Sequence, residues 1–224
     1  MSVVVVSAGL SVPSSTRLLG ERLAAAATGQ APKDARVIEL RDLAVDIAHN
    51  FTSGFPAPAL ADAMDAVTGA DGLIVVTPVF SASYSGLFKS FFDVLGVRDR
   101  RALAGKPVLI AATGGTPRHS LVLEHALRPL FAHLRAVVVP TGVYAAAQDW
   151  GDRGLDARIE RAGGELAALM GALPAASGGT DGGVDSGTDS GTGGVTRGGV
   201  ADDRFDARNV VPFEEQLAAL RSAG

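Results

Sequence analysis

Hydroxyl side chains and a glycine gather in residues 7–16, Ser-Ala-Gly-Leu-Ser-Val-Pro-Ser-Ser-Thr, between an apolar run and a helical pattern. Backbone N–H groups at the start of a helix lack partners, and the helix dipole favours an anion there, so this segment predicts a phosphate site. The predicted phosphate contacts, with Ser14 and Thr16 as the main hydroxyl donors, are Gly9, Leu10, Ser11, Ser14, Ser15 and Thr16. The alternative is that Ser14 or Ser15 only caps the helix. The segment matches neither Gly-x-Gly-x-x-Gly nor Gly-x-x-x-x-Gly-Lys-Ser/Thr, so the usual dinucleotide fingerprint and triphosphate loop are absent.

Two further segments have the composition of a border around a flat heterocycle. Residues 77–86, Thr-Pro-Val-Phe-Ser-Ala-Ser-Tyr-Ser-Gly, combine a proline, two aromatic rings and small side chains. Residues 113–119, Thr-Gly-Gly-Thr-Pro-Arg-His, contain adjacent glycines, which let the backbone approach a ligand closely. The predicted ring contacts are Pro78, Val79, Phe80, Ser81, Ala82, Ser83, Tyr84, Ser85, Thr113, Gly114, Gly115, Thr116 and His119. The alternatives are a strand-to-helix turn capped by Ser83 or Ser85, a generic glycine turn, and a His119 that only caps a helix.

The composition of the chain excludes several other chemistries. Its 224 residues include no cysteine, which excludes disulfides, thiol catalysis and cysteine-ligated metals. The four histidines form no His-Glu-x-x-His pair, so a metal site has no support. A net charge of −4 argues against nucleic acid as a partner. No apolar run approaches the roughly 20 residues of a membrane span, and no signal-peptide pattern opens the chain, so we expect a cytoplasmic protein without membrane contact.

Alternating periodicities predict the elements that position these segments. Short β-branched runs predict buried strands at residues 3–6, 37–40, 73–76, 108–112 and 137–139. Helical patterns follow the strands at residues 15–27, 57–67, 87–95, 121–134 and 155–170. This alternation indicates a parallel, doubly wound α/β sheet, in which ligands bind at the carboxyl ends of the strands. The three segments follow the first, third and fourth strands, so they should meet at one edge.

The chain is predicted to have three parts. Residues 1–173 contain all of the predicted strands and form the α/β domain. Residues 174–204 are dominated by Gly, Ser, Thr and Asp and cannot bury enough apolar surface to become ordered, which predicts a flexible insertion. Residues 205–224 form a tail with a short helix signal, in which a proline, two acids and two leucines follow at helical spacing.

Residues 77–93, followed by residues 112–119, resemble the NAD(P)H-dependent FMN reductases of the flavodoxin-like superfamily. The resemblance is to the alkanesulfonate-monooxygenase type and, within it, to the reductases that partner luciferase-like monooxygenases. Pro-Ser-Ser-Thr at residues 13–16 is similar to the family's phosphate loop, although the common Gly-Ser-x-Arg form is absent, and residues 143–150 and 211–215 are similar to the luciferase-partner branch. The resemblance implies an α/β, flavodoxin-like three-layer sandwich with a five-stranded parallel sheet of order 2-1-3-4-5.

The resemblance also implies the activity. The chain would be an NAD(P)H:FMN oxidoreductase with FMN and NADPH or NADH as cofactors. Hydride would pass from the nicotinamide to the flavin, so no catalytic side chain is required. The reduced FMN would be supplied to a flavin-dependent monooxygenase of the luciferase-like type. The alternatives are an enzyme that retains FMN and reduces quinones, azo dyes or chromate, a flavodoxin-like electron carrier, and a binding module without redox turnover.

His125 occupies a position of interest in the predicted helix of residues 121–134. In the alkanesulfonate branch, the residue at the matching position is aromatic and lies in a π-helical insertion at a tetramer interface beside the flavin. The many apolar residues of this helix also indicate a homodimer or homotetramer with His125 near the interface. The alternative is a helix residue without a special role. The candidates for binding the 2′-phosphate of NADPH are Lys89, Arg100, Arg101 and Arg118. Arg17 is interpreted as a solvated helix-face side chain, with assistance to the phosphate of the first loop as the alternative.

Overall fold

The structure, a computed structural model, describes residues 2–29 and 36–172. All described residues belong to one compact unit. The predicted insertion of residues 174–204 and the predicted tail of residues 205–224 lie outside the described residues. The division into three parts therefore stays a prediction.

The strands of the described residues form one sheet whose main path runs β2-β1-β3-β5-β6. Their bounds are β1 Val3–Ser7, β2 Arg36–Glu39, β3 Gly72–Phe80, β4 Ser83–Tyr84, β5 Pro107–Gly114, β6 Val137–Val138 and β7 Val143–Ala146. All pairs on this path are parallel, whereas β4 pairs antiparallel with β3. The short strands β6 and β7 pair with successive parts of β5. In the register, Val137 of β6 is opposite Pro107, and Val143 of β7 is opposite Ala111. The main path matches the predicted order 2-1-3-4-5, with β6 and β7 as an interrupted fifth strand. The sheet has seven strands and not the predicted five, because β7 pairs with β5 beyond β6 and β4 adds an antiparallel strand to β3.

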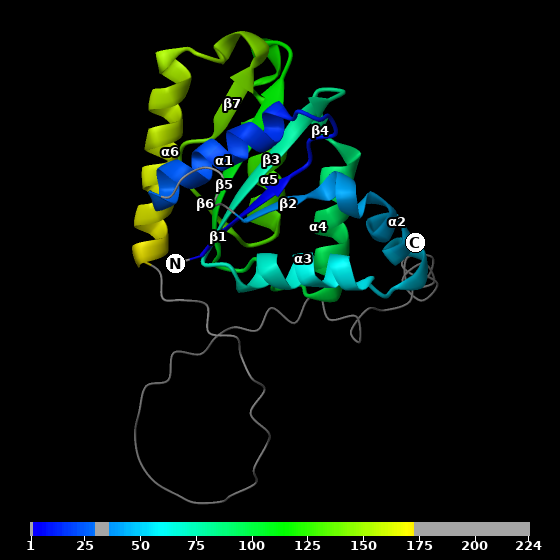
Figure 1. The fold of residues 1–224 in the computed structure, drawn as a ribbon. Helices are drawn as coiled ribbons and strands as arrows, with labels where there is room; N and C mark the ends of the chain where they lie inside the picture. The colour runs from blue at the N-terminus through cyan, green and yellow to red at the C-terminus, as the bar shows by residue number, and fades with distance from the viewer. Residues whose placement is uncertain (1, 30–35, 173–224) are drawn as a thin grey trace, which may run out of the picture. The chain divides into compact units, whose positions relative to one another are not determined.

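Helices cover both faces of this sheet, as Figure 1 shows. One face carries α1 (Ser15–Thr28) and α6 (Arg153–Ala172), and the other carries α2 (Ala44–Ser53), α3 (Pro58–Gly69), α4 (Gly86–Arg98) and α5 (Arg128–His133). Side chains alternate between the faces of a strand, so Val5 of β1 packs in the apolar cluster of α1 and α6, while Val4 and Val6 pack in the opposite cluster. The predicted three-layer sandwich is confirmed.

Several elements differ from the predicted pattern. The second strand ends at Glu39, because residues 40–43 form a 3-10 turn that leads into the unpredicted helix α2. The predicted helix of residues 121–134 contains a π-helix, Leu123–Leu127, before α5. Among the residues that the structure describes, no helix is long and apolar enough to cross a membrane, and no group of three His, Asp or Glu side chains forms a metal site.

Candidate functional site

The loops after β1, β3 and β5 meet at the carboxyl edge of the sheet. Pro78 of β3 stands beside Thr113 of β5 in the strand register. The hydroxyl oxygen of Thr16, in the first turn of α1, lies 2.8 Å from that of Thr113, and both side chains are buried. These contacts bring the three segments predicted from the sequence into one site.

The first loop turns tightly onto the start of α1. Ser14 is the N-cap residue, and its Oγ accepts a hydrogen bond from the Arg17 N–H at 3.2 Å. A Cβ atom on Gly9 would lie 2.1 Å from Ser14 Oγ, so any other residue here would displace the Ser14 hydroxyl from its capping position. Ser14 therefore caps α1 as an acceptor, which leaves its O–H able to donate to a phosphate, while Thr16 directs its hydroxyl to Thr113. Phosphate contact by these residues and by the exposed Leu10, Ser11 and Ser15 stays a prediction.

The second loop is a β-hairpin between β3 and β4. Phe80 pairs with Ser83, and the two residues between them, Ser81 and Ala82, have φ angles of 48° and 64°. This left-handed conformation is strained for residues that carry a Cβ, and such strain is often found at ligand sites. Ser85 caps α4 and is buried, whereas residues 78–84 are half-buried or exposed. The described geometry thus leaves residues 78–84 accessible to a ligand.

The third loop is held by a residue that sequence reasoning did not single out. Tyr144 of β7 donates a hydrogen bond from its hydroxyl to the Thr116 carbonyl oxygen at 2.7 Å. A Cβ on Gly114 would lie 2.1 Å from the Tyr144 hydroxyl oxygen, whereas a Cβ on Gly115 would meet no atom within 4 Å. Burial, with a further effect of the Asp149 carboxylate, raises the pKa of Tyr144. Tyr144 therefore fixes the backbone of this loop and leaves Gly115 open.

Two exposed histidines lie at the end of the third segment and in the π-helix. His119 is exposed in a 3-10 turn that Thr116 caps. His125 is exposed within the π-helix, and Arg128 fixes this helix by bonding Glu124 through Nε at 2.6 Å and the Val139 carbonyl through Nη1 at 3.1 Å. The hydrogen bonds from Arg128 also lower the pKa of Glu124. The π-helical geometry implied by the resemblance is therefore present at His125.

The four basic residues proposed for a 2′-phosphate do not form a described cluster. The Lys89 ammonium lies 2.5 Å from an Asp93 carboxylate oxygen on the next turn of α4. The other three, Arg100, Arg101 and Arg118, are exposed, and within the described residues their side chains make no hydrogen bond or ion pair. Their role toward a 2′-phosphate stays a prediction.

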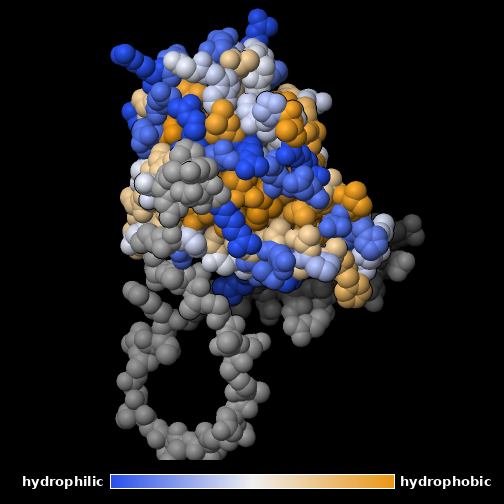
Figure 2. Space-filling view, viewed as in Figure 1, coloured by the Kyte–Doolittle hydropathy of each residue, from blue (hydrophilic) through white to orange (hydrophobic). Residues whose placement is uncertain are grey.

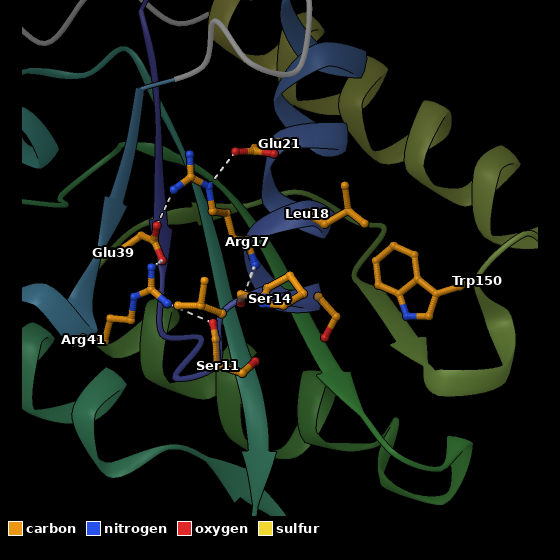
Figure 3. Close-up of a pocket in the computed structure, with 11 residues that line it drawn as sticks. Ser11, Ser14, Arg17, Leu18, Glu21, Glu39, Arg41 and Trp150 are labelled. Carbon is orange, nitrogen blue, oxygen red and sulfur yellow. Dashed lines mark hydrogen bonds and ion pairs between the residues drawn. The ribbon is translucent and has the colours of Figure 1, made fainter.

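A pocket opens beside the first loop, as Figure 3 shows. It has a volume of 630 Å³ and extends from the Arg17, Glu39 and Arg41 side chains past Ser14 to Trp150. The interpretation of Arg17 as only a solvated helix-face side chain is incomplete, because its guanidinium pairs with both Glu21 and Glu39. The pocket therefore places a charged wall and an aromatic ring at the edge of the predicted phosphate loop.

Comparison with known proteins shows to which family this chain belongs. A sequence model of the NADPH-dependent FMN reductases matches residues 1–151. The chain belongs to this family. It is 42% identical over 174 residues to an FMN reductase (NADPH) of Pseudomonas aeruginosa, covering 75% of this chain and 92% of that protein. It is also 42% identical over 177 residues to the NADH-dependent FMN reductase SfnF of Pseudomonas fluorescens, covering 76% and 92% of the two chains.

A solved structure supports the same assignment. An oxidoreductase from Corynebacterium diphtheriae superposes with a TM-score of 0.69 at 46% identity, over 77% of this chain and 98% of that chain. The predicted resemblance to FMN reductases and the predicted flavodoxin-like fold class are therefore confirmed. The two Pseudomonas relatives of this chain are named as FMN reductases that use NADPH and NADH, in agreement with the predicted FMN and nicotinamide cofactors.

The residues of this FMN reductase family member fit FMN at the carboxyl edge. The start of α1 offers N–H groups and the exposed hydroxyls of Ser11 and Ser15 to a phosphate, beside Gly9, whose lack of a Cβ leaves room for the Ser14 side chain. The half-exposed Phe80 and the open position at Gly115 leave accessible surface for a flat ring. The donor set thus suits a ligand with an anion at one end and an aromatic system at the other.

Proposed function

We propose that the protein is an NAD(P)H:FMN oxidoreductase that supplies reduced FMN to a flavin-dependent monooxygenase. The observation that carries this proposal is the joining of the three loops at one edge, by the Thr16–Thr113 contact and the pairing of Pro78 with Thr113, in a chain of the FMN reductase family. The names of the relatives support the use of FMN with NADPH or NADH. They leave the preference between the two coenzymes open.

The side chains of this site bind and orient rather than react. The cofactors supply the chemistry, a hydride transfer from the reduced nicotinamide to the flavin ring. The first loop holds the phosphate through N–H groups that the helix dipole makes favourable for an anion. The hairpin at Ser81–Ala82 and the loop fixed by Tyr144 border the ring and leave one side accessible for the nicotinamide. No general acid or base is needed among the described residues.

Transfer of reduced flavin to a monooxygenase requires a site that opens. The exposed π-helix residue His125 and the neighbouring Leu121, which is 62% exposed, form the surface where we place contact between subunits of a homodimer or homotetramer. Leu123, in contrast, is 7% exposed and belongs to the core of its own subunit. Fewer residues of this helix are therefore available for a subunit contact than its apolar content indicated.

The decisive experiment mixes the purified protein with FMN and either NADPH or NADH and follows the nicotinamide absorbance. Oxidation that depends on added FMN is the expected result. A protein that oxidises no coenzyme would be an electron carrier or a binding module. A yellow protein that needs no added FMN and reduces quinones would be an FMN-retaining reductase.

A further inference from the structure

The pocket beside the first turn of α1 has two unlike walls. On one side, Glu39 at the end of β2 is 8% exposed and ion-pairs with both Arg17 and Arg41. On the other side, Trp150 is partly buried against the cluster of α1 and α6, and Leu18 is 46% exposed. Figure 3 shows Ser14 and the first turn of α1 between these walls. A charged surface, a helix N-terminus and an aromatic ring therefore follow one another along a single pocket.

The arginines are held on the pocket wall by a buried charge. One carboxylate oxygen of Glu39, Oε2, is fully buried and accepts no aligned hydrogen bond, although Arg41 Nη2 lies 2.9 Å away. A buried carboxylate that loses its partner is strongly destabilising, so Glu39 retains both guanidinium groups beside it. Arg41 also donates through Nη1 to the Ser11 carbonyl at 2.9 Å, which ties the charged wall to the phosphate loop.

Arg17 still has a donor for a ligand. Arg17 uses Nε to bond Glu21 at 2.7 Å and Nη1 to bond Glu39, while its Nη2 bonds no other described residue. Glu21 and Glu39 offset the charges of Arg17 and Arg41, and Arg41 Nε also lies 3.4 Å from an oxygen of the exposed Asp42, so the arginines of this wall carry no excess positive charge. The N-terminus of α1 adds a partial positive charge. The free Arg17 donor and the helix N-terminus suit one or two phosphates. A further phosphate group elsewhere in the pocket would meet no excess positive charge.

We propose that this pocket is a subsite for the adenosine diphosphate half of a dinucleotide with a free ribose 2′-hydroxyl, an inference that rests on the proposed function. The purine lies against Trp150 and Leu18, since a flat base stacks on aromatic and apolar side chains. The phosphates lie between Arg17, Arg41 and the first turn of α1. A 2′-phosphate would bring close to two more negative charges toward Glu21 and Glu39, so the subsite selects against it.

Two dinucleotides carry this group: NADH, a coenzyme of the proposed reaction, and FAD, which contains FMN. In FAD, the adenylate is joined to the phosphate that FMN also has, and the pocket begins at the loop proposed for that phosphate. In NADH, the adenylate is joined to the nicotinamide half. The pocket would recognise the same adenosine diphosphate group in both dinucleotides.

The first arm measures binding directly, because Trp150 is the single tryptophan of the chain. Titration of the flavin-free protein with ADP is expected to quench tryptophan fluorescence to saturation. Adenosine 2′,5′-bisphosphate and inorganic pyrophosphate should bind about tenfold more weakly or not at all. Leu18→Glu should weaken ADP binding by about tenfold, since it adds a carboxylate to the pocket, whereas Val97→Glu on the opposite layer should bind ADP like the wild type. Absence of saturable ADP binding, or equal binding of pyrophosphate, would overturn the subsite.

The second arm identifies the source of the adenylate. A higher KM for FAD in Leu18→Glu, larger than any change for FMN, assigns the subsite to FAD. A higher KM for NADH at saturating FMN, with little change for NADPH, assigns it to the coenzyme. Unchanged KM values for FAD and NADH, or an equal rise for FMN, overturn the inference. A wild-type protein that oxidises no coenzyme defeats the proposed function, and the ADP titration then still decides whether the pocket binds an adenylate.

Discussion

The hydroxyl of Tyr144 shows how much one side chain determines at this site. It bonds the Thr116 carbonyl and occupies the space where a Cβ of Gly114 would stand. The loop that borders the proposed ring site is therefore fixed from β7, a strand that follows it in the sequence by many residues. Substitutions at these positions should act on flavin binding before they act on the fold.

Gly114→Ala is expected to weaken FMN binding by about tenfold, which corresponds to about 1.4 kcal/mol. The new methyl group must displace the Tyr144 hydroxyl and, with it, the backbone at Thr116. Flavin fluorescence quenching measures the affinity. Gly164→Ala, at an exposed position of α6 outside the proposed site, is the matched control, since its Cβ meets open space and should change the affinity little. Equal affinities for the two variants would show that Tyr144 does not set the loop.

The titration of Tyr144 gives a second residue-scale test. The chain has two tyrosines, so Tyr84→Phe leaves Tyr144 as the only phenol. Burial raises its pKa, so its phenolate absorbance should appear at a pH above the ordinary value of about 10. Because folding raises this pKa, the stability that the neutral hydroxyl contributes is present below about pH 10 and is lost as the pH rises through the folded pKa. A midpoint at or below 10 would contradict the buried hydrogen bond.

At the scale of elements, the β3–β4 hairpin combines an ordered ladder with a strained turn. Two consecutive positive φ angles at Ser81 and Ala82 are typical of a type I′ turn, for which Asn-Gly is the favoured sequence. The protein retains two unfavourable residues at the loop proposed to border the flavin. This pattern is expected where binding, rather than stability, determines the sequence.

The double variant Ser81→Asn with Ala82→Gly should raise the free energy of unfolding by about 1–2 kcal/mol, because it relieves the left-handed strain of two residues. Thermal or denaturant unfolding of the flavin-free protein measures the gain. Ala82→Gly alone should give about half of it. A loss of stability in both variants would mean that the Ser81 and Ala82 side chains make contacts that outweigh the strain.

The elements that sequence analysis missed share a physical reason. The helix α2 is short and buries little apolar surface, since Ile47 and Asn50 are its buried side chains while Val45 and Phe51 are exposed. The strand β7 is half alanine and has no β-branched run. The buried strands and the helices with regular apolar spacing were predicted because burial itself imposes their period.

The site was predictable in outline for a similar reason. Parallel strand order brings the three loops together, and their glycines and hydroxyls are visible in the sequence. The Thr16–Thr113 and Tyr144–Thr116 contacts were not predictable, because each joins residues far apart in the chain without a local signal. The charged pocket wall was missed since Glu39 and Arg41 look like ordinary surface residues of a strand end.

At the scale of the whole molecule, the proposal requires an assembly around the π-helix. Leu121→Glu combined with His125→Glu should shift the protein toward smaller species in light scattering, because burying unpaired carboxylates at a contact is costly. Ala157→Glu, exposed on α6 in the opposite layer, is the matched control and should leave the assembly intact. Leu123 is unsuitable for this test, since it is buried within its own subunit. A wild-type protein that is monomeric at micromolar concentration would contradict the assembly.

The central claim is that this chain reduces FMN held by its phosphate at the first loop. Its most direct test compares kcat/KM for FMN and for riboflavin, with NADH or NADPH, in the wild type and in Ser14→Ala. Loss of a hydrogen bond to a charged group costs about 1.5–3 kcal/mol, so we predict a decrease of roughly tenfold or more for FMN. Riboflavin has no phosphate, and its kcat/KM should stay unchanged, which also controls for the loss of the helix cap. An equal decrease for both flavins, or a wild-type protein that reduces neither, would contradict the account.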